Sequence, residues 1–249
     1  MKKYIALTKE KTGRVLLILL GVIALVAYLL SPSLNQDTNY HLFSDQTQCA
    51  AVPNFWNVIT NVPFLMVGVL GLIKSKYFTK LKLQKQVFFA GISLVAFGSG
   101  YYHWNPNNST LVWDRLPMTV AFMALFSVII GEYFNEKLGR KTFVPLLITG
   151  IASVFYWVLF DDLKFYVLVQ FYPMLAIPII LIFMKRKNQL SWGYWALLVA
   201  YVLAKIFEHF DHETHDFLSF ISGHSIKHLV AALGVYCLLY FYQFKATRK

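Results

Sequence analysis

The chain has 249 residues, of which 57% are hydrophobic and only 14% are charged. Soluble domains carry about 25% charged residues, so this composition excludes an ordinary soluble domain. The formal net charge of +11 would suggest nucleic-acid binding in a soluble protein. Here the basic residues follow the connections between apolar runs, so we expect no nucleic-acid partner.

Apolar runs long enough to cross a hydrocarbon core of about 30 Å as helices recur along the chain. Helices satisfy their own backbone hydrogen bonds inside lipid, so the sequence predicts an all-α, polytopic membrane helix bundle. The pattern predicts eight spans, at residues 15–30, 55–73, 87–103, 113–131, 143–160, 165–184, 192–209 and 224–241.

The first span stands apart from the rest. Residues 1–35 are predicted to form a cytoplasmic N-terminus and an extra transmembrane anchor, and residues 36–249 hold the other seven spans. The basic start and apolar stretch would also suit a secretory signal, but no small-residue cleavage site follows Leu30. An uncleaved anchor is therefore expected, and removing it would leave the orientation of the other spans unchanged.

Basic residues mark alternate connections between the predicted spans. Cytoplasmic loops of membrane proteins carry an excess of Lys and Arg, so both termini are predicted to face the cytoplasm. The groups are Lys2, Lys3, Lys9, Lys11 and Arg14; Lys74, Lys76, Lys80, Lys82 and Lys85; Lys137, Arg140 and Lys141; Lys185, Arg186 and Lys187; and Lys245, Arg248 and Lys249.

This topology brings five polar residues to the outer face. His103 and Ser99, spaced i, i+4, end one span, Asp114 begins the next, and His224 and His228, also i, i+4, begin the last. Three imidazoles with a carboxylate nearby suit a catalytic zinc, because three protein ligands leave a fourth position for water. Asp114 could orient or deprotonate that water, and Ser99 could bond a ligand or a developing oxyanion.

Other interpretations of these residues stay open. Histidines near a membrane interface often bond only to backbone, headgroups or water, and a proton or ion pathway would use the same side chains. A second histidine cluster also competes for metal, although a solvated acidic loop rich in histidine explains it without any ligand role. Its members are His209, His212 and His215, interspersed with Asp211, Glu213 and Asp216.

Two further polar pairs lie within predicted spans. Lys205 and Glu208 are spaced i, i+3, which favours an ion pair inside the membrane. Asn57 and Asn61 are expected to bridge helices.

Three ordered motifs resemble the alkaline ceramidase family. They are the segments 99–103 (SGYYH), 113–118 (WDRLPM) and 223–228 (GHSIKH), and the likeness extends to 55–57 (FWN) with Asn61. Residues 40–64 are similar to the bacterial ceramidase-like branch of a superfamily that includes adiponectin-receptor-like and GPI-remodelling membrane hydrolases. The resemblance implies a seven-helix hydrolase core with zinc, to which the first span is an addition.

The resemblance also implies a reaction. His103, His224 and His228 would be the zinc ligands, and Asp114 and Ser99 would assist the water and the oxyanion. The protein would be a zinc-dependent amidohydrolase acting on linear amides, and it would cleave ceramide or a related N-acyl lipid to release a fatty acid. Its location would be the bacterial inner membrane, with the active site near the extracytoplasmic face.

One segment departs from the family pattern. Animal alkaline ceramidases share an acidic, calcium-binding stretch before the second span, whereas this chain has 45–48 (DQTQ) and Asn54 there. We therefore do not expect calcium. The substrate stays open to other lipid amides or esters, and the alternatives to an enzyme are a lipid-binding, receptor-like protein with a structural zinc and a proton-coupled transporter. These motifs carry no information on acyl length or oligomeric state.

Overall fold

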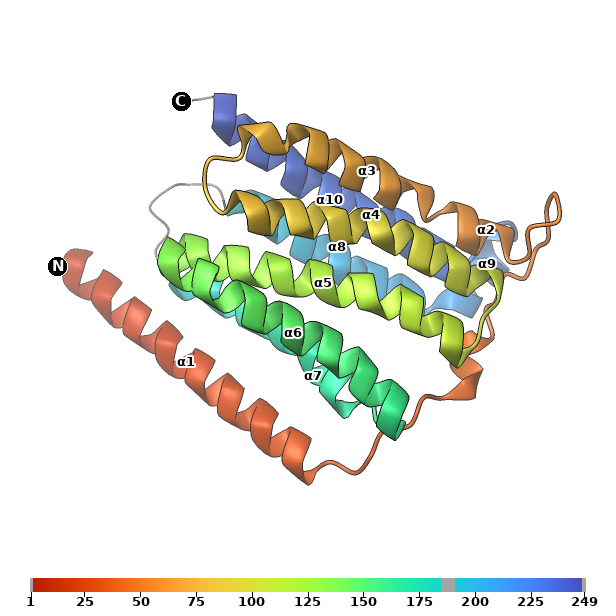
Figure 1. The fold of residues 1–249 in the computed structure, drawn as a ribbon, viewed down its shortest axis with the longest axis horizontal. Coiled ribbons are helices and arrows are strands. Elements are labelled where there is room, and N and C mark those ends of the chain that lie inside the picture. Colours follow the sequence, from red (N-terminus) through yellow and green to blue (C-terminus); the bar gives the residue numbers. More distant parts are fainter. Residues whose placement is uncertain (1, 185–190, 248–249) are drawn as a thin grey trace.

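The computed structural model describes residues 2–184 and 191–247, which form an all-helical bundle, as predicted (Figure 1). This part of the chain has no β-strand, apart from an isolated bridge between Cys49 and Val52. Lys185, Arg186, Lys187, Arg248 and Lys249, which entered the charge argument, lie outside the described residues. The α-helices are α1 (Lys2–Leu30), α2 (Phe55–Ile59), α3 (Val62–Lys74), α4 (Lys82–Trp104), α5 (Asn108–Tyr133), α6 (Glu136–Phe160), α7 (Lys164–Phe183), α8 (Trp192–His209), α9 (Asp211–Leu218) and α10 (Gly223–Thr247), with 3-10 turns η1 (Thr38–His41) and η2 (Ser75–Tyr77).

Six helical segments among the described residues are long and apolar enough to cross a membrane. They are Thr8–Leu30, Phe55–Tyr77, Asn108–Tyr133, Glu136–Phe160, Lys164–Phe183 and Gly223–Phe244. The two long helices outside this set, α4 and α8, carry several ionisable side chains, among them Lys85 and His103 in α4 and Lys205 and Glu208 in α8. Six apolar helices are compatible with a membrane protein.

The helices pack side by side, with α1 on the outside of the bundle (Figure 1). Helix α4 lies between α3 and α5, α10 packs against α8 and α3, and α1 packs against α7. Only 6% of the apolar window of α1 is buried, so most of its side chains face outward. The start of α1 and the end of α10 lie at the same end of the bundle, opposite α2 and α9 (Figure 1).

The second predicted span, residues 55–73, is broken in the structure. Helix α2 ends at Ile59 and α3 begins at Val62, so a short non-helical step separates them. Pro63 explains the break, because it has no N–H to donate to the carbonyl of Ile59 and suits the first turn of a new helix. The step leaves Thr60 and Asn61 buried in the bundle.

Two other elements differ from the sequence-based expectation. Helix α5 begins at Asn108, five residues before the predicted start at 113, because Asn107 caps it by accepting from the backbone N–H of Ser109 at 2.9 Å and of Thr110 at 3.1 Å. Asp114 therefore lies in the second turn of this helix. The histidine-rich segment after α8 is not an open loop but the short helix α9.

A buried ion pair closes the bundle at the end opposite α9. Lys85, expected in a connection, lies in the first turn of α4, and its ammonium group is 3.1 Å from the Glu132 carboxylate on α5. Both side chains are less than 10% exposed, and the ammonium lies 4.4 Å from the centre of the Tyr242 ring. A buried charge needs such a partner, so this pair ties α4, α5 and α10 together.

Candidate metal centre

Three imidazoles meet inside the bundle. His103 comes from the last turn of α4, and His224 and His228 come from the first two turns of α10. All three side chains are buried, and their ligand atoms lie within 4.8 Å of one another. Within residues 2–184 and 191–247 this is the one group of three or more His, Cys, Asp or Glu side chains close enough to hold a metal ion.

The spacing of these nitrogens suits a tetrahedral ion. The Nε2 atoms of His103 and His224 are 3.4 Å apart. Two ligands at the usual zinc–nitrogen distance of about 2.0–2.1 Å, set at a tetrahedral angle, would be about 3.3–3.4 Å apart. The donor set, three imidazoles and no thiolate, is also one that catalytic zinc uses. The group could therefore hold a metal ion.

The imidazole of His228, a candidate metal ligand on α10, is oriented by Thr60, which lies in the break between α2 and α3. The Thr60 hydroxyl donates to the Trp56 carbonyl at 2.6 Å and lies 3.0 Å from Nδ1 of His228. Because the hydroxyl hydrogen is already committed, the oxygen accepts from the imidazole Nδ1–H. This fixes the tautomer in which the Nε2 of His228 keeps its lone pair for a metal.

His224 is oriented by Asp211, at the start of α9. One oxygen of the Asp211 carboxylate accepts from the backbone N–H of His224 at 2.6 Å, and the other accepts from the backbone N–H of Ser44 at 3.0 Å. The carboxylate thus caps the beginning of α10 and joins it to the segment before α2. Gly223 permits this approach, since a Cβ there would lie 2.2 Å from the Phe207 carbonyl oxygen.

The segment before α2 covers the imidazoles. The ring of Phe43 is buried, and its centre lies 4.7 Å from the ring centres of both His103 and His224. The side-chain amide of Asn54 donates to the His103 carbonyl at 2.9 Å. These contacts keep bulk water away from one side of the three-histidine group.

Ser99 and Asp114 are brought together beside this group. Ser99 is buried one turn before His103, and its hydroxyl lies close enough to the Asp114 carboxylate on α5 to act on it electrostatically. Both residues, together with His228, line the same cavity. Gly98 makes the contact possible, because a Cβ at this position would lie 1.9 Å from the Trp113 carbonyl oxygen. Only glycine lets α4 approach α5 so closely here.

The second histidine cluster does not form a metal group among the described residues. His209 and His212 are exposed, and His215 is partly buried with its Nδ1 2.9 Å from the Ser44 hydroxyl. The predicted helix bridges are met in part. Asn57 accepts from the Ser225 hydroxyl at 2.7 Å and so links α2 to α10, whereas the amide of Asn61 donates at 2.8 Å to Asn57, within its own segment.

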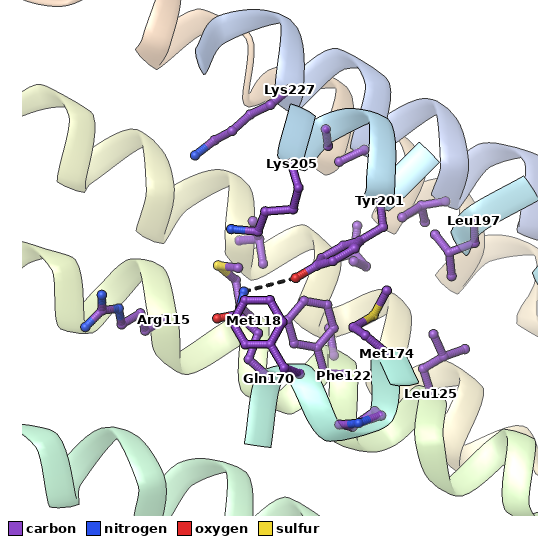
Figure 2. Close-up of a pocket in the computed structure, with 18 of the residues that line it drawn as sticks. Arg115, Met118, Phe122, Leu125, Gln170, Met174, Leu197, Tyr201, Lys205 and Lys227 are labelled. Carbon is purple, nitrogen blue, oxygen red and sulfur yellow. Dashed lines mark hydrogen bonds between the residues drawn. The ribbon is translucent and has the colours of Figure 1, made fainter. Parts of the chain in front are cut away.

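A cavity of about 300 Å³ lies inside the bundle (Figure 2), and His228 is the member of the three-histidine group that lines it. Most of its wall is apolar, with side chains from α4, α5, α7, α8 and α10. Ionisable and polar side chains also line it, among them Ser99, Asp114, Arg115, Gln170, Tyr201, Lys205, Glu208, Lys227 and His228. Such a cavity suits an amphiphile with an acyl chain and a polar group.

The bundle has membrane-like helices and three buried imidazoles beside an apolar cavity, an arrangement that supports a membrane hydrolase with a possible metal centre. A family model described as Ceramidase matches residues 44–249, so the chain belongs to the ceramidase family and the resemblance of the motifs is confirmed. Helix α1 lies outside the matched residues. None of the curated proteins matches the chain. Membership of this family implies a lipid substrate in general.

Sequence reasoning overlooked three residues of the site. Thr60 contacts His228 because of the helix break before Pro63, which the sequence pattern does not predict. Asp211 was grouped with the acidic residues around the second histidine cluster. Lys227 has no carboxylate at i±3 or i±4 on its own helix that would have indicated an ion pair. Its carboxylate partner, Glu208, lies on α8. The signal available for Lys227 was a lysine inside a predicted span, next to a candidate ligand.

Proposed function

We propose that this protein is a zinc-dependent hydrolase of the membrane that cleaves the amide bond of ceramide or a related N-acyl lipid and releases a fatty acid. The observation that carries the proposal is the convergence of His103, His224 and His228 at one end of an apolar cavity, in a member of the ceramidase family. The imidazoles are the ligands, and the cavity receives the acyl chain.

The three histidines supply neutral nitrogen ligands, and a zinc ion held by them would polarise a water molecule and the scissile carbonyl. Asp114 is the general base in this proposal, because its carboxylate lies beside the group and lines the cavity. It takes a proton from the attacking water and returns it to the amine as the C–N bond breaks and the new C–O bond completes the fatty acid.

Ser99 holds Asp114 in place. In this proposal its hydroxyl donates to the Asp114 carboxylate, so its first role is to orient the base. A direct bond from Ser99 to the developing oxyanion would require that hydroxyl to turn away from Asp114. We therefore assign Ser99 primarily as a positioning residue.

The membrane arrangement in this proposal has eight spans. The helices α4 and α8 cross the bilayer with the six apolar segments. Lys85 and His103 of α4 are buried in the bundle, and Lys205 and Glu208 of α8 line the cavity. The start of α1 and the end of α10 share one end of the bundle, which we assign to the cytoplasm. The metal centre then lies near the extracytoplasmic face of a bacterial inner membrane, and residues 36–249 form the hydrolase unit.

The test is purification of the full-length protein, measurement of bound metal and assay of fatty acid release from N-acyl lipids. One zinc per chain and turnover that chelation removes are expected. His224→Ala and His228→Ala should each lose zinc and hydrolysis. If both variants keep zinc and hydrolysis, the ligand assignment is wrong; if the protein binds lipid and zinc but never hydrolyses, the metal serves a receptor.

A further inference from the structure

Two lysines share one carboxylate at the polar end of the cavity. Lys205 and Glu208 lie on α8 and Lys227 lies on α10. Lys205 Nζ is bonded to one Glu208 oxygen, and Lys227 Nζ lies 2.8 Å from the other. All three residues line the cavity together with His228. Figure 2 shows the two lysine side chains projecting from neighbouring helices in the same direction.

The trio of Lys205, Lys227 and Glu208 carries two positive charges and one negative charge. A single lysine would neutralise Glu208 and join α8 to α10, so the second ammonium group has no carboxylate of its own in the trio. Asp114 and Arg115, which also line the cavity, add one charge of each sign. The guanidinium of Arg115 is already engaged, donating to Gln36 at 2.6 Å and lying 4.2 Å from the Trp157 ring centre.

The cavity lining therefore carries three cations, Lys205, Lys227 and Arg115, and two carboxylates, Glu208 and Asp114. An excess cation beside an apolar cavity in a membrane is costly, and a ligand of opposite charge would complete the pairing. Each ammonium has three N–H donors, of which the bond to Glu208 uses one. The remaining donors can reach an acceptor in the cavity. Lys227 and His228 line the same cavity, so that acceptor would lie beside the candidate metal centre.

We propose that Lys205 and Lys227 bind an anionic group on the amine portion of the substrate. The substrate class is then an N-acyl lipid that carries a carboxylate or phosphate close to its amide, such as an N-acyl amino acid, rather than a neutral ceramide. This inference rests on the proposed function. The acyl chain lies along the apolar wall, the amide lies at the three-histidine group, and the anion lies against the lysines.

The test compares N-dodecanoyl-serine with N-dodecanoyl-serinol, which has a neutral hydroxymethyl group in place of the carboxylate. Dodecanoate is a third probe. Binding to the full-length protein in detergent is measured by calorimetry, both as purified and after chelation, so that a carboxylate bound to the metal is recognised. Acyl release is measured separately. N-dodecanoyl-serine should bind about 10- to 100-fold more tightly than the serinol, as expected for charge-assisted hydrogen bonds.

The variants make the expectation specific. Lys205→Met and Lys227→Met should remove the preference for N-dodecanoyl-serine, and Lys227→Arg should retain it. Glu208→Gln should strengthen it, because both ammonium groups are then free; a purely structural trio would not give this gain. Lys85→Met is the matched control, since it removes a buried lysine from another Lys–Glu pair at the far end of the bundle and should leave the preference unchanged.

Equal binding of the serine and serinol probes, or a preference that survives both Lys→Met variants, would overturn the inference. Lysine-dependent binding of dodecanoate without any serine preference would overturn it too, because the anion would then be the acyl product. Failure of the proposed function looks different. In that case the serine preference and its lysine dependence persist in binding, while no probe is hydrolysed.

Discussion

The Thr60 hydroxyl lies 3.0 Å from Nδ1 of His228 and, by donating to Trp56, can only accept from that nitrogen. Thr60→Val keeps the shape of the side chain but leaves a buried N–H without an acceptor. Loss of such a partner typically lowers metal affinity by about 10- to 100-fold. Titration with a competing chelator should show this loss, and Thr60→Ser should restore the affinity. Unchanged zinc affinity in Thr60→Val would show that the tautomer is set elsewhere.

Metal removal should destabilise the protein as well as inactivate it. The three buried imidazoles form a site only in the folded protein. A ligand that binds only the folded state, at a free concentration of about 100 times its Kd, adds about 2.7 kcal/mol to the free energy of unfolding. We therefore expect chelation to lower the Tm in detergent and zinc to restore it. The control is His212→Ala, which changes an exposed histidine on α9. Chelation should lower the Tm of this variant by the same amount as that of the wild type. An unchanged Tm in the chelated wild type would argue against a resident ion.

Asp114→Asn separates catalysis from metal binding. The amide has nearly the shape of the carboxylate but cannot take a proton, so acyl release should fall by about 10²- to 10⁴-fold. Zinc content should stay at the wild-type level, because the imidazoles are the ligands. Parallel metal analysis and a turnover assay check both expectations. Full activity in Asp114→Asn would exclude this residue as the general base.

Ser99→Ala should have a smaller effect than the change at Asp114. It removes the hydroxyl that we propose orients the Asp114 carboxylate, but it leaves the proposed base itself. We expect kcat to fall by about tenfold, the loss produced by removing one orienting hydrogen bond of about 1.4 kcal/mol. The Ser99→Thr variant, which keeps the hydroxyl, should recover part of the rate. A loss in Ser99→Ala as large as that in Asp114→Asn would instead assign the hydroxyl to the reacting atoms.

Gly98→Ala tests the close approach of α4 and α5. The added methyl group would lie 1.9 Å from the Trp113 carbonyl oxygen, so one helix must move. Overpacking of this kind costs about 1–3 kcal/mol, and it should also part Ser99 from Asp114. Tm and kcat should therefore fall together. Gly100→Ala is the control, because a Cβ there has no atom within 4 Å, and wild-type behaviour is expected.

The sequence alone was enough to predict that His103, His224 and His228 lie together, because each position follows from a simple rule. Spacing i, i+4 places His224 and His228 on one face of a helix, and the alternation of spans brings the end of α4 to the start of α10. Belonging to the ceramidase family agrees with the motifs that contain these residues. The count of eight spans and the cytoplasmic termini remain predictions.

The residues that support the site could not be predicted in the same way. Thr60 contacts His228 across 168 positions of sequence, and only because the helix breaks before Pro63. Asp211 reaches His224 because the acidic segment folds as α9 and its first residue turns toward α10. Both contacts depend on departures from regular helical periodicity, which the hydrophobic pattern does not record.

Helix α10 carries His224, Lys227 and His228 within two consecutive turns. A small rotation or translation of this one helix would therefore displace two of the proposed metal ligands and the proposed anion contact together. Mutations deep in α10, far from the reacting atoms, should thus alter zinc affinity and substrate choice together, so neither property could be tuned in isolation through this helix.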